Sequence, residues 1–141
     1  MKDRLDKIGP IISAIGGEGA EIVGGDPDGL YIYAEPDGGA VYAAVFKDEG
    51  EAVRYFDPTD NLFDLIRDAW EAENSDEAKR WAVMEYEVQG TKFDVQFRYP
   101  EELDPNDSSS DRREAALKKR YGDKPVIYPP MPEHFQELKS E

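Results

Sequence analysis

The segment Trp81–Pro100 reads W-A-V-M-E-Y-E-V-Q-G-T-K-F-D-V-Q-F-R-Y-P, and it contains two runs in which apolar and polar residues alternate. Gly90 separates the two runs. A period of two on both sides of a glycine turn predicts an antiparallel hairpin with one buried face and one polar face. The polar face carries charged and amide groups and no nucleophile, so we expect the hairpin to serve as a scaffold. The residues predicted to share the buried face of its second strand, opposite Met84–Val88, are Phe93, Val95, Phe97 and Tyr99.

Apolar residues at helical spacing between Leu5 and Ile15 predict an opening helix. Pro10 interrupts this pattern, so the helix either kinks there or restarts with Pro10 near its first turn. Gly16-Gly17 is predicted to end the helix. Segments 30–34, 40–46 and 52–56 are predicted strands, the first two joined by a turn at 35–39 and the first covered on both faces.

The sequence Asp57-Pro58-Thr59-Asp60 supplies turn and N-cap residues for a central helix that runs to about Glu73. After the hairpin, Asp111 and Glu114 have capping-box spacing and predict a short basic helix closed by Gly122. Residues 125–132 are predicted to be extended. The predicted class is therefore α+β, with a mostly antiparallel sheet of about five strands (three, then a hairpin), an N-terminal helix, a central helix and a short C-terminal helix. We expect one domain over residues 1–132 and a polar tail over 133–141.

Composition narrows the class of protein further. The chain has 141 residues and no cysteine, which excludes disulfides and thiolate metal sites and fits a reducing compartment. Its apolar runs are too short to span a membrane, and its first residues lack the apolar stretch of a signal peptide. These features predict a cytoplasmic protein that does not associate with membranes. The oligomeric state stays open.

The formal net charge is -15, and it is unevenly distributed. Residues 21–74 hold 14 acidic and 3 basic residues and residues 75–111 hold 10 and 4, so these two segments together carry -17. The last thirty residues carry +2. Such a field repels nucleic acid and would speed association with a basic protein. The alternative is that the charge only keeps the chain in solution.

Residues that could carry catalysis are few. His134 is the only histidine and lies in the tail, and the serines Ser108–Ser110 lie in a predicted loop without an elbow motif. Asp26-Pro27-Asp28-Gly29 resembles part of a calcium loop but lacks its other ligand positions, and is interpreted as a turn. We therefore expect no enzyme activity, no metal and no cofactor.

The densest run of acidic residues lies at the start and on the outer side of the central helix. Such a run is either a solvated helix face whose first members cap the helix, or a negative strip for arginine and lysine side chains of a partner. The candidate partner-binding residues are Asp57, Asp60, Asp64, Asp68 and Glu71.

The order of elements and the hairpin motif resemble the YezG-like immunity proteins of bacterial polymorphic-toxin systems. The motif is a tryptophan entering a strand, a glycine turn with Lys-Phe, and an aromatic strand ending in tyrosine, followed by a basic helix and a proline-rich segment. The residues that carry it here are Trp81, Gly90, Lys92, Phe93, Asp94, Phe97 and Tyr99.

This resemblance implies a non-enzymatic antitoxin that binds and neutralises a cognate toxin, often a nuclease and therefore basic. Two other classes stay open. One is a small carboxylate-rich ligand-binding or metal-dependent enzyme domain, and the other is a regulatory or structural protein without a toxin partner.

Overall fold

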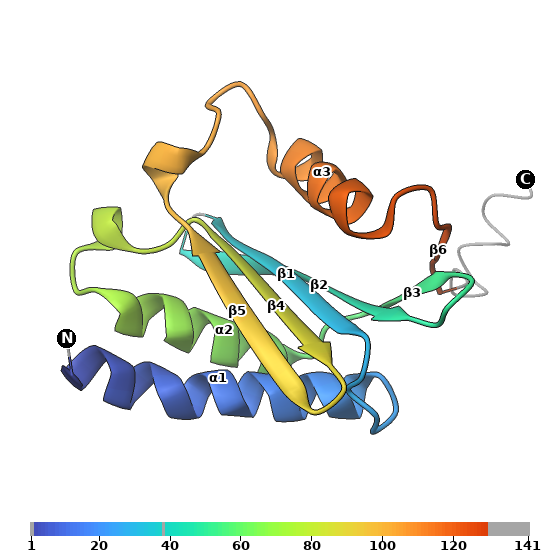
Figure 1. The fold of residues 1–141 in the computed structure, drawn as a ribbon. Helices are drawn as coiled ribbons and strands as arrows, with labels where there is room; N and C mark the ends of the chain where they lie inside the picture. Colours follow the sequence, from blue (N-terminus) through green and yellow to red (C-terminus); the bar gives the residue numbers. More distant parts are fainter. Residues whose placement is uncertain (1, 38, 130–141) are drawn as a thin grey trace, which may run out of the picture.

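The computed structural model describes residues 2–37 and 39–129, and places helices on both faces of a six-stranded sheet (Figure 1). Helices α1 and α2 lie side by side against one face, and α3 lies over the other. The elements are, in chain order, α1 (Lys2–Ile22), β1 (Leu30–Asp37), β2 (Ala40–Asp48), β3 (Val53–Phe56), α2 (Asp60–Glu73), η1 (Glu77–Lys79), β4 (Val83–Gln89), β5 (Lys92–Arg98), η2 (Pro100–Glu102), α3 (Ser109–Tyr121) and β6 (Val126–Ile127).

The strand order is β5-β4-β1-β2-β3-β6, and every neighbouring pair is antiparallel except β3 and β6. The predicted α+β class with a mostly antiparallel sheet is confirmed. The predicted hairpin is β4–β5, in which Met84 pairs with Phe97 and Val88 with Phe93 across the turn at Gly90, whose φ is 64°. Among the described residues, none of the helices combines the length and the apolar content needed to cross a bilayer.

The sheet has one strand more than the sequence predicts. β6 has two residues and pairs in parallel with β3, starting where the N–H of Val53 donates to the carbonyl oxygen of Pro125 at 2.8 Å. A strand this short carries no periodicity, which is why only an extended segment was expected. Residues 130–132 of that segment, the predicted tail 133–141 and His134 lie outside the described residues.

The main core lies between the sheet and the pair α1 and α2. Trp70 of α2 and Trp81 before β4 are both buried, and the Trp70 indole Nε1 donates to the carbonyl oxygen of Trp81 at 3.1 Å. This hydrogen bond attaches the segment that leads into the hairpin to the central helix. The opposite face of the sheet holds a second, aromatic-rich cluster, made of Tyr31, Tyr33, Ala44, Phe46, Val53 and Val83. β1 is therefore buried on both faces, as predicted.

The prediction that Gly16-Gly17 ends the first helix is wrong, because α1 continues through both glycines to Ile22. A Cβ atom on Gly16 would lie 2.2 Å from the Tyr86 hydroxyl oxygen, and one on Gly19 would lie 2.7 Å from Leu30 Cδ2. These glycines permit close approach of the helix to the sheet. In the sequence alone, a pair of glycines at this place indicates the end of a helix. Pro10 lies inside the same helix.

The predicted start of the basic helix is also wrong, because the N-cap is Ser108 and not Asp111. Ser108 is the N-cap of α3: its hydroxyl accepts from the N–H of Asp111 at 3.1 Å, and the Asp111 carboxylate accepts from the N–H of Ser108 at 3.1 Å. Asp111 thus occupies the N3 position of the capping box, where the sequence predicted it to be the N-cap. Gly122 ends the helix as predicted, with its N–H donating to the carbonyl oxygen of Lys118 at 2.8 Å.

Candidate functional site

The central helix α2 presents its acidic residues to solvent because its apolar stripe faces the sheet. Leu62, Ile66 and Trp70 are buried on the inner side. The helix is capped by Thr59, whose hydroxyl accepts from the N–H of Leu62 at 3.1 Å. A neutral hydroxyl therefore does the capping, and the expectation that the first carboxylates cap the helix is wrong. We call the predicted partner-binding residues the α2 acidic surface: Asp57, Asp60, Asp64, Asp68 and Glu71.

All five residues of the α2 acidic surface are exposed. Asp60, Asp64 and Asp68 follow each other at intervals of four, so their carboxylates lie in one row on the helix. Like charges at this spacing destabilise a helix by about 0.2–0.5 kcal/mol per pair. Among the described residues, the one ion pair in which these carboxylates take part joins Asp64 to Arg67 at 4.0 Å, and both side chains are largely exposed. The negative charge of this surface is thus nearly uncompensated within the described part of the chain.

Glu18 of α1 adds a sixth carboxylate at the N-terminal end of α2. The Thr59 hydroxyl donates to Glu18 Oε2 at 2.6 Å and the Asn61 amide donates to Oε1 at 2.8 Å. These two hydrogen bonds hold the pKa of Glu18 below its usual value. The sequence did not predict this contribution, because Glu18 lies beyond the glycines that were interpreted as the helix end and joins α2 through a long-range contact.

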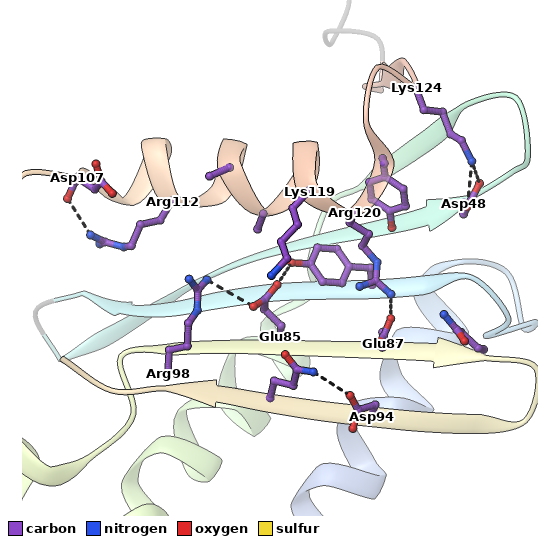
Figure 2. A pocket seen from close by; sticks show the side chains of 16 residues that line it. Asp48, Glu85, Glu87, Asp94, Arg98, Asp107, Arg112, Lys119, Arg120 and Lys124 are labelled. Carbon is purple, nitrogen blue, oxygen red and sulfur yellow. Dashed lines mark hydrogen bonds and ion pairs between the residues drawn. The ribbon is translucent and has the colours of Figure 1, made fainter. Parts of the chain in front are cut away.

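A groove of about 740 Å³ lies on the opposite side of the sheet, between α3 and the outer face of β4 and β5 (Figure 2). Its floor is the polar face of the hairpin, which the alternation predicts to be in contact with water. Its wall is the side of the basic helix α3 that faces the sheet. The labelled charged residues around it are Asp48, Glu85, Glu87, Asp94, Arg98, Asp107, Arg112, Lys119, Arg120 and Lys124.

Six of these ten charged residues form ion pairs with each other. Glu85 forms an ion pair with Arg98 at 3.4 Å, and Glu87 forms one with Arg120. Lys124 Nζ lies 3.0 Å from Asp48 Oδ1. The pKa of the Asp48 carboxyl is lowered, first by the N–H of Gly50 and then by Lys124. The groove therefore contributes little to the net negative charge.

Tyr31 lies at the inner side of the groove and is fully buried. Its hydroxyl donates to Glu85 Oε1 at 2.6 Å, and the Arg120 guanidinium lies 4.5 Å from its ring centroid. Burial raises the pKa of Tyr31 far above its usual value, and the hydrogen bond to Glu85 raises it further. A general base or nucleophile needs a pKa shifted toward neutrality, so this shift runs opposite to catalytic use.

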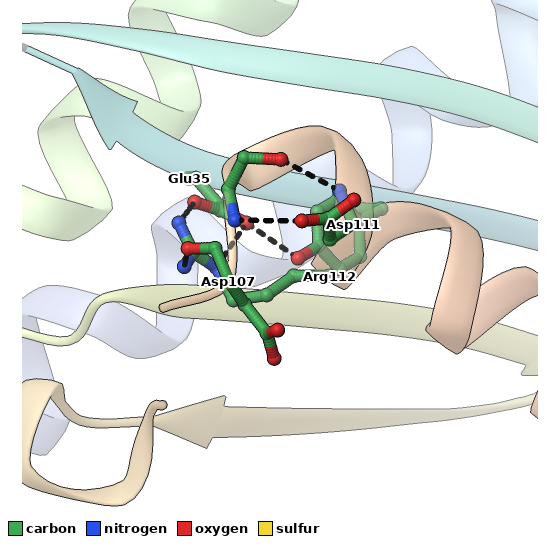
Figure 3. Close-up of polar contacts among 6 residues, drawn as sticks. Glu35, Asp107, Asp111 and Arg112 are labelled. Atoms are coloured by element: carbon green, nitrogen blue, oxygen red, sulfur yellow. Dashed lines mark hydrogen bonds and ion pairs between the residues drawn. The ribbon is translucent and has the colours of Figure 1, made fainter. Parts of the chain in front are cut away.

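The start of α3 is attached to the sheet by a buried carboxylate (Figure 3). Glu35 of β1 is 4% exposed and accepts two hydrogen bonds from Arg112, from Nε at 3.0 Å and from Nη2 at 2.7 Å. The Tyr33 hydroxyl donates to the same carboxylate at 2.5 Å. Arg112 Nη1 donates to the carbonyl oxygen of Asp107 at 2.8 Å, and the hydrogen bond to Glu35 raises the pKa of Arg112. Each group is satisfied, which makes this a structural anchor.

Carboxylates do not gather into a metal site in the described part of the chain, where no group of three or more histidine, aspartate or glutamate side chains is placed to hold an ion. The calcium-loop fragment forms a turn as predicted: Asp26 Oδ1 accepts from the N–H of Asp28 at 3.0 Å. Asp28 Oδ1 in turn accepts from the N–H of Gly90 at 2.7 Å, and so connects this turn to the tip of the hairpin.

In comparisons with known proteins, no family model and no curated protein matches the chain. The surfaces themselves are therefore the basis for inferring function. The sequence predicted the α2 acidic surface residue by residue, but it did not predict the groove. A usable signal was present, since the C-terminal segment carries +2 next to a body of -17, and opposite charges of this kind favour docking of α3 onto the sheet.

Proposed function

We propose that this chain is a cytoplasmic, non-enzymatic immunity protein that binds and neutralises a basic toxin domain, of the nuclease type, through the α2 acidic surface. The observation that carries the proposal is the contrast between the two sides of the sheet. On the α3 side, Asp48, Glu85 and Glu87 each have a cation of the same chain. On the α2 side, five exposed carboxylates share one weak ion pair within residues 2–37 and 39–129.

The charge difference between the two sides is large. Residues 57–77 contain eight acidic residues and one basic residue, which gives -7, whereas residues 107–124 contain four acidic and six basic residues, which gives +2. An unpaired acidic row costs stability in the free protein and is relieved when cations of a partner approach. A nuclease toxin must be basic where it holds phosphate, so such a domain is the partner of complementary charge.

The alternative of a carboxylate-rich ligand-binding or metal-dependent enzyme domain would use the groove. Three of its carboxylates, Asp48, Glu85 and Glu87, are paired with arginine or lysine, and the pKa of its buried tyrosine is shifted away from neutrality. These features favour a binding function over catalysis. They also make the groove a poorer site for a charged ligand than the open surface of α2.

The test begins with a search of the neighbouring genes for a basic toxin domain, and then measures its rate of association with this chain by stopped flow at low and high salt. The variant is Asp64→Lys combined with Asp68→Lys. We expect its association rate at low salt to fall by about tenfold or more and to depend less on salt, with a smaller effect on dissociation. Both side chains point away from the core, so the fold should be kept.

A matched control is Glu114→Lys combined with Asp123→Lys, which makes the same change in net charge with exposed residues on the α3 side. The control should lose much less of the association rate. Equal losses in both variants would show a net-charge effect without a specific surface. Absence of any basic protein partner would refute the immunity proposal.

A further inference from the structure

The hairpin leaves a long free edge on the sheet. Among the described strands, β5 pairs with β4 alone and ends the strand order, while the opposite end is the two-residue β6. The extended backbone continues through Tyr99, with φ -110° and ψ 160°. Figure 1 shows β5 at the front edge of the sheet with no element beside it. Such an edge presents unpaired N–H and C=O groups that accept another strand.

The register tells which backbone groups are free. Gln89 and Lys92 flank the two-residue turn. The two residues that flank such a turn form a hydrogen-bonded pair, so the backbone N–H and C=O groups of Lys92 face β4. Alternate residues from Lys92 onward therefore direct their backbone groups to β4. The backbone groups of Phe93, Val95 and Phe97 point outward.

Those same residues carry incompletely covered apolar side chains. Phe93 is 53% exposed, although its ring stacks on Tyr86 with centroids 5.5 Å apart and an interplanar angle of 2°. Val95 and Phe97 are half-buried. The predicted shared face is thus formed, but it stays partly open because β5 has a neighbour on one side only. A strand added at this edge would cover backbone and apolar groups together.

We propose that β5 is a self-association edge, at which two copies of this chain pair β5 with β5 in antiparallel direction around a two-fold axis at Gln96. This register places Asp94 opposite Arg98 of the second copy, twice per dimer, and Val95 opposite Phe97. An axis at Val95 would oppose Lys92 and Arg98, and an axis at Asp94 would oppose two aspartates. All three registers keep the apolar faces of the two copies continuous. The register with its axis at Gln96 is favoured because it alone of the three places opposite charges across the strand pair.

Arg98 and Asp94 both have unused hydrogen-bonding capacity for this contact. Arg98 Nε is buried and has no hydrogen-bond acceptor among the described residues, although the guanidinium reaches Glu85 through Nη2. The Asp94 carboxylate is exposed, and in the described part of the chain it accepts a hydrogen bond from the Gln96 amide alone, at 3.3 Å. In the proposed dimer the Asp94 carboxylate of the second copy lies across the strand pair from the Arg98 guanidinium, where it can accept a charge-assisted hydrogen bond.

Net charge does not oppose the contact strongly. Residues 81–100 carry three acidic and two basic residues, so the hairpin has a local charge of -1 within a chain of -15. Charges farther than about 8 Å apart are largely screened at physiological ionic strength. The pairing surface is therefore a part of this acidic chain on which two copies repel each other only weakly.

The experiment is sedimentation equilibrium of the full chain over a range of concentrations at fixed ionic strength. The wild type should show a reversible monomer–dimer equilibrium. Asp94→Arg places arginine opposite arginine, and should weaken dimerisation by about tenfold or more because each dimer carries the contact twice. Adding Arg98→Asp to this variant exchanges the charges and should restore dimerisation. Glu101→Arg makes the same charge change at an exposed residue beyond β5 and should leave the equilibrium unchanged.

A second variant separates pairing from folding. Val95→Pro removes an outward N–H from the edge, where proline is tolerated, and should abolish the dimer while circular dichroism shows an intact fold. A wild type that stays monomeric at every concentration would overturn the proposal. An exchanged-charge variant that is folded but monomeric would overturn it as well, as would equal weakening by Glu101→Arg. The proposal does not depend on the toxin partner.

Discussion

Replacing Gly16 by alanine tests the finding that α1 needs glycine to approach the sheet. An added Cβ atom would lie 2.2 Å from the Tyr86 hydroxyl oxygen and 3.3 Å from the ring carbon that carries it. Tyr86 is 2% exposed and its ring is held by Phe93, so it has little room to move. The neighbouring Gly17 is in the same helix, and a Cβ atom there meets nothing within 4 Å. The two glycines therefore form a matched pair.

The magnitudes follow from two opposing effects. Alanine in place of glycine inside a helix gains about 1 kcal/mol, which both variants receive. Overpacking a well-packed site costs about 1–3 kcal/mol, which only Gly16→Ala receives. We expect Gly17→Ala to raise the free energy of unfolding by about 1 kcal/mol and Gly16→Ala to lower it by about 1 kcal/mol. The difference of about 2 kcal/mol isolates the contact with Tyr86.

The assay is urea unfolding, with the melting temperature as a second measurement that should move by about 2–4 °C per kcal/mol. Combining Gly16→Ala with Tyr86→Phe removes the clashing hydroxyl. The double variant should recover most of the lost stability, with a coupling energy of at least about 1 kcal/mol. If Gly16→Ala is as stable as Gly17→Ala, or if Tyr86→Phe recovers nothing, the close approach is not what requires glycine.

Two further predictions concern charged contacts. Arg112→Met should lower the free energy of unfolding, measured in urea, by on the order of 3 kcal/mol, because it leaves the buried Glu35 carboxylate without its cation. The control is Lys118→Ala, at an exposed position of the same helix, which should change this free energy by less than about 0.5 kcal/mol. Glu18→Gln should destabilise the fold at neutral pH and progressively less as the solution is acidified. The folded pKa of Glu18 lies below its ordinary value of 4.5, so its contribution is complete above that value and is lost as the pH falls through the folded pKa; a difference that does not shrink in acid would contradict this account.

The features that sequence predicted well are those set by local pattern. The alternation around Gly90 specifies β4 and β5 and their register, since a slip by one residue would expose Phe97 and bury Asp94. The stripe of α2 likewise specifies which side is buried, and therefore that Asp64 and its neighbours are exposed. In both cases the hydrophobic period and the burial agree.

The features that sequence did not predict depend on contacts between distant segments. Gly16 looks like a helix stop until Tyr86 is placed against it, seventy residues later. Ser108 and Asp111 form a capping box that overlaps another plausible one, and backbone geometry decides between them. The sixth strand and the groove under α3 arise only when the C-terminal segment returns to the sheet. The apolar pattern within a single segment does not determine such contacts.

The distribution of charge connects the two proposed surfaces. Arg112 and Arg120 of α3 and the following Lys124 form ion pairs with carboxylates of the sheet, so three of the six cations in residues 107–124 are neutralised within the chain. The α2 acidic surface on the other face shares a single ion pair among the described residues. The edge of β5, with its opposite charges at Asp94 and Arg98, lies between them and is suited to a second copy of the same chain. A dimer formed there would leave both α2 acidic surfaces exposed, so self-association and capture of a basic partner are compatible in one assembly.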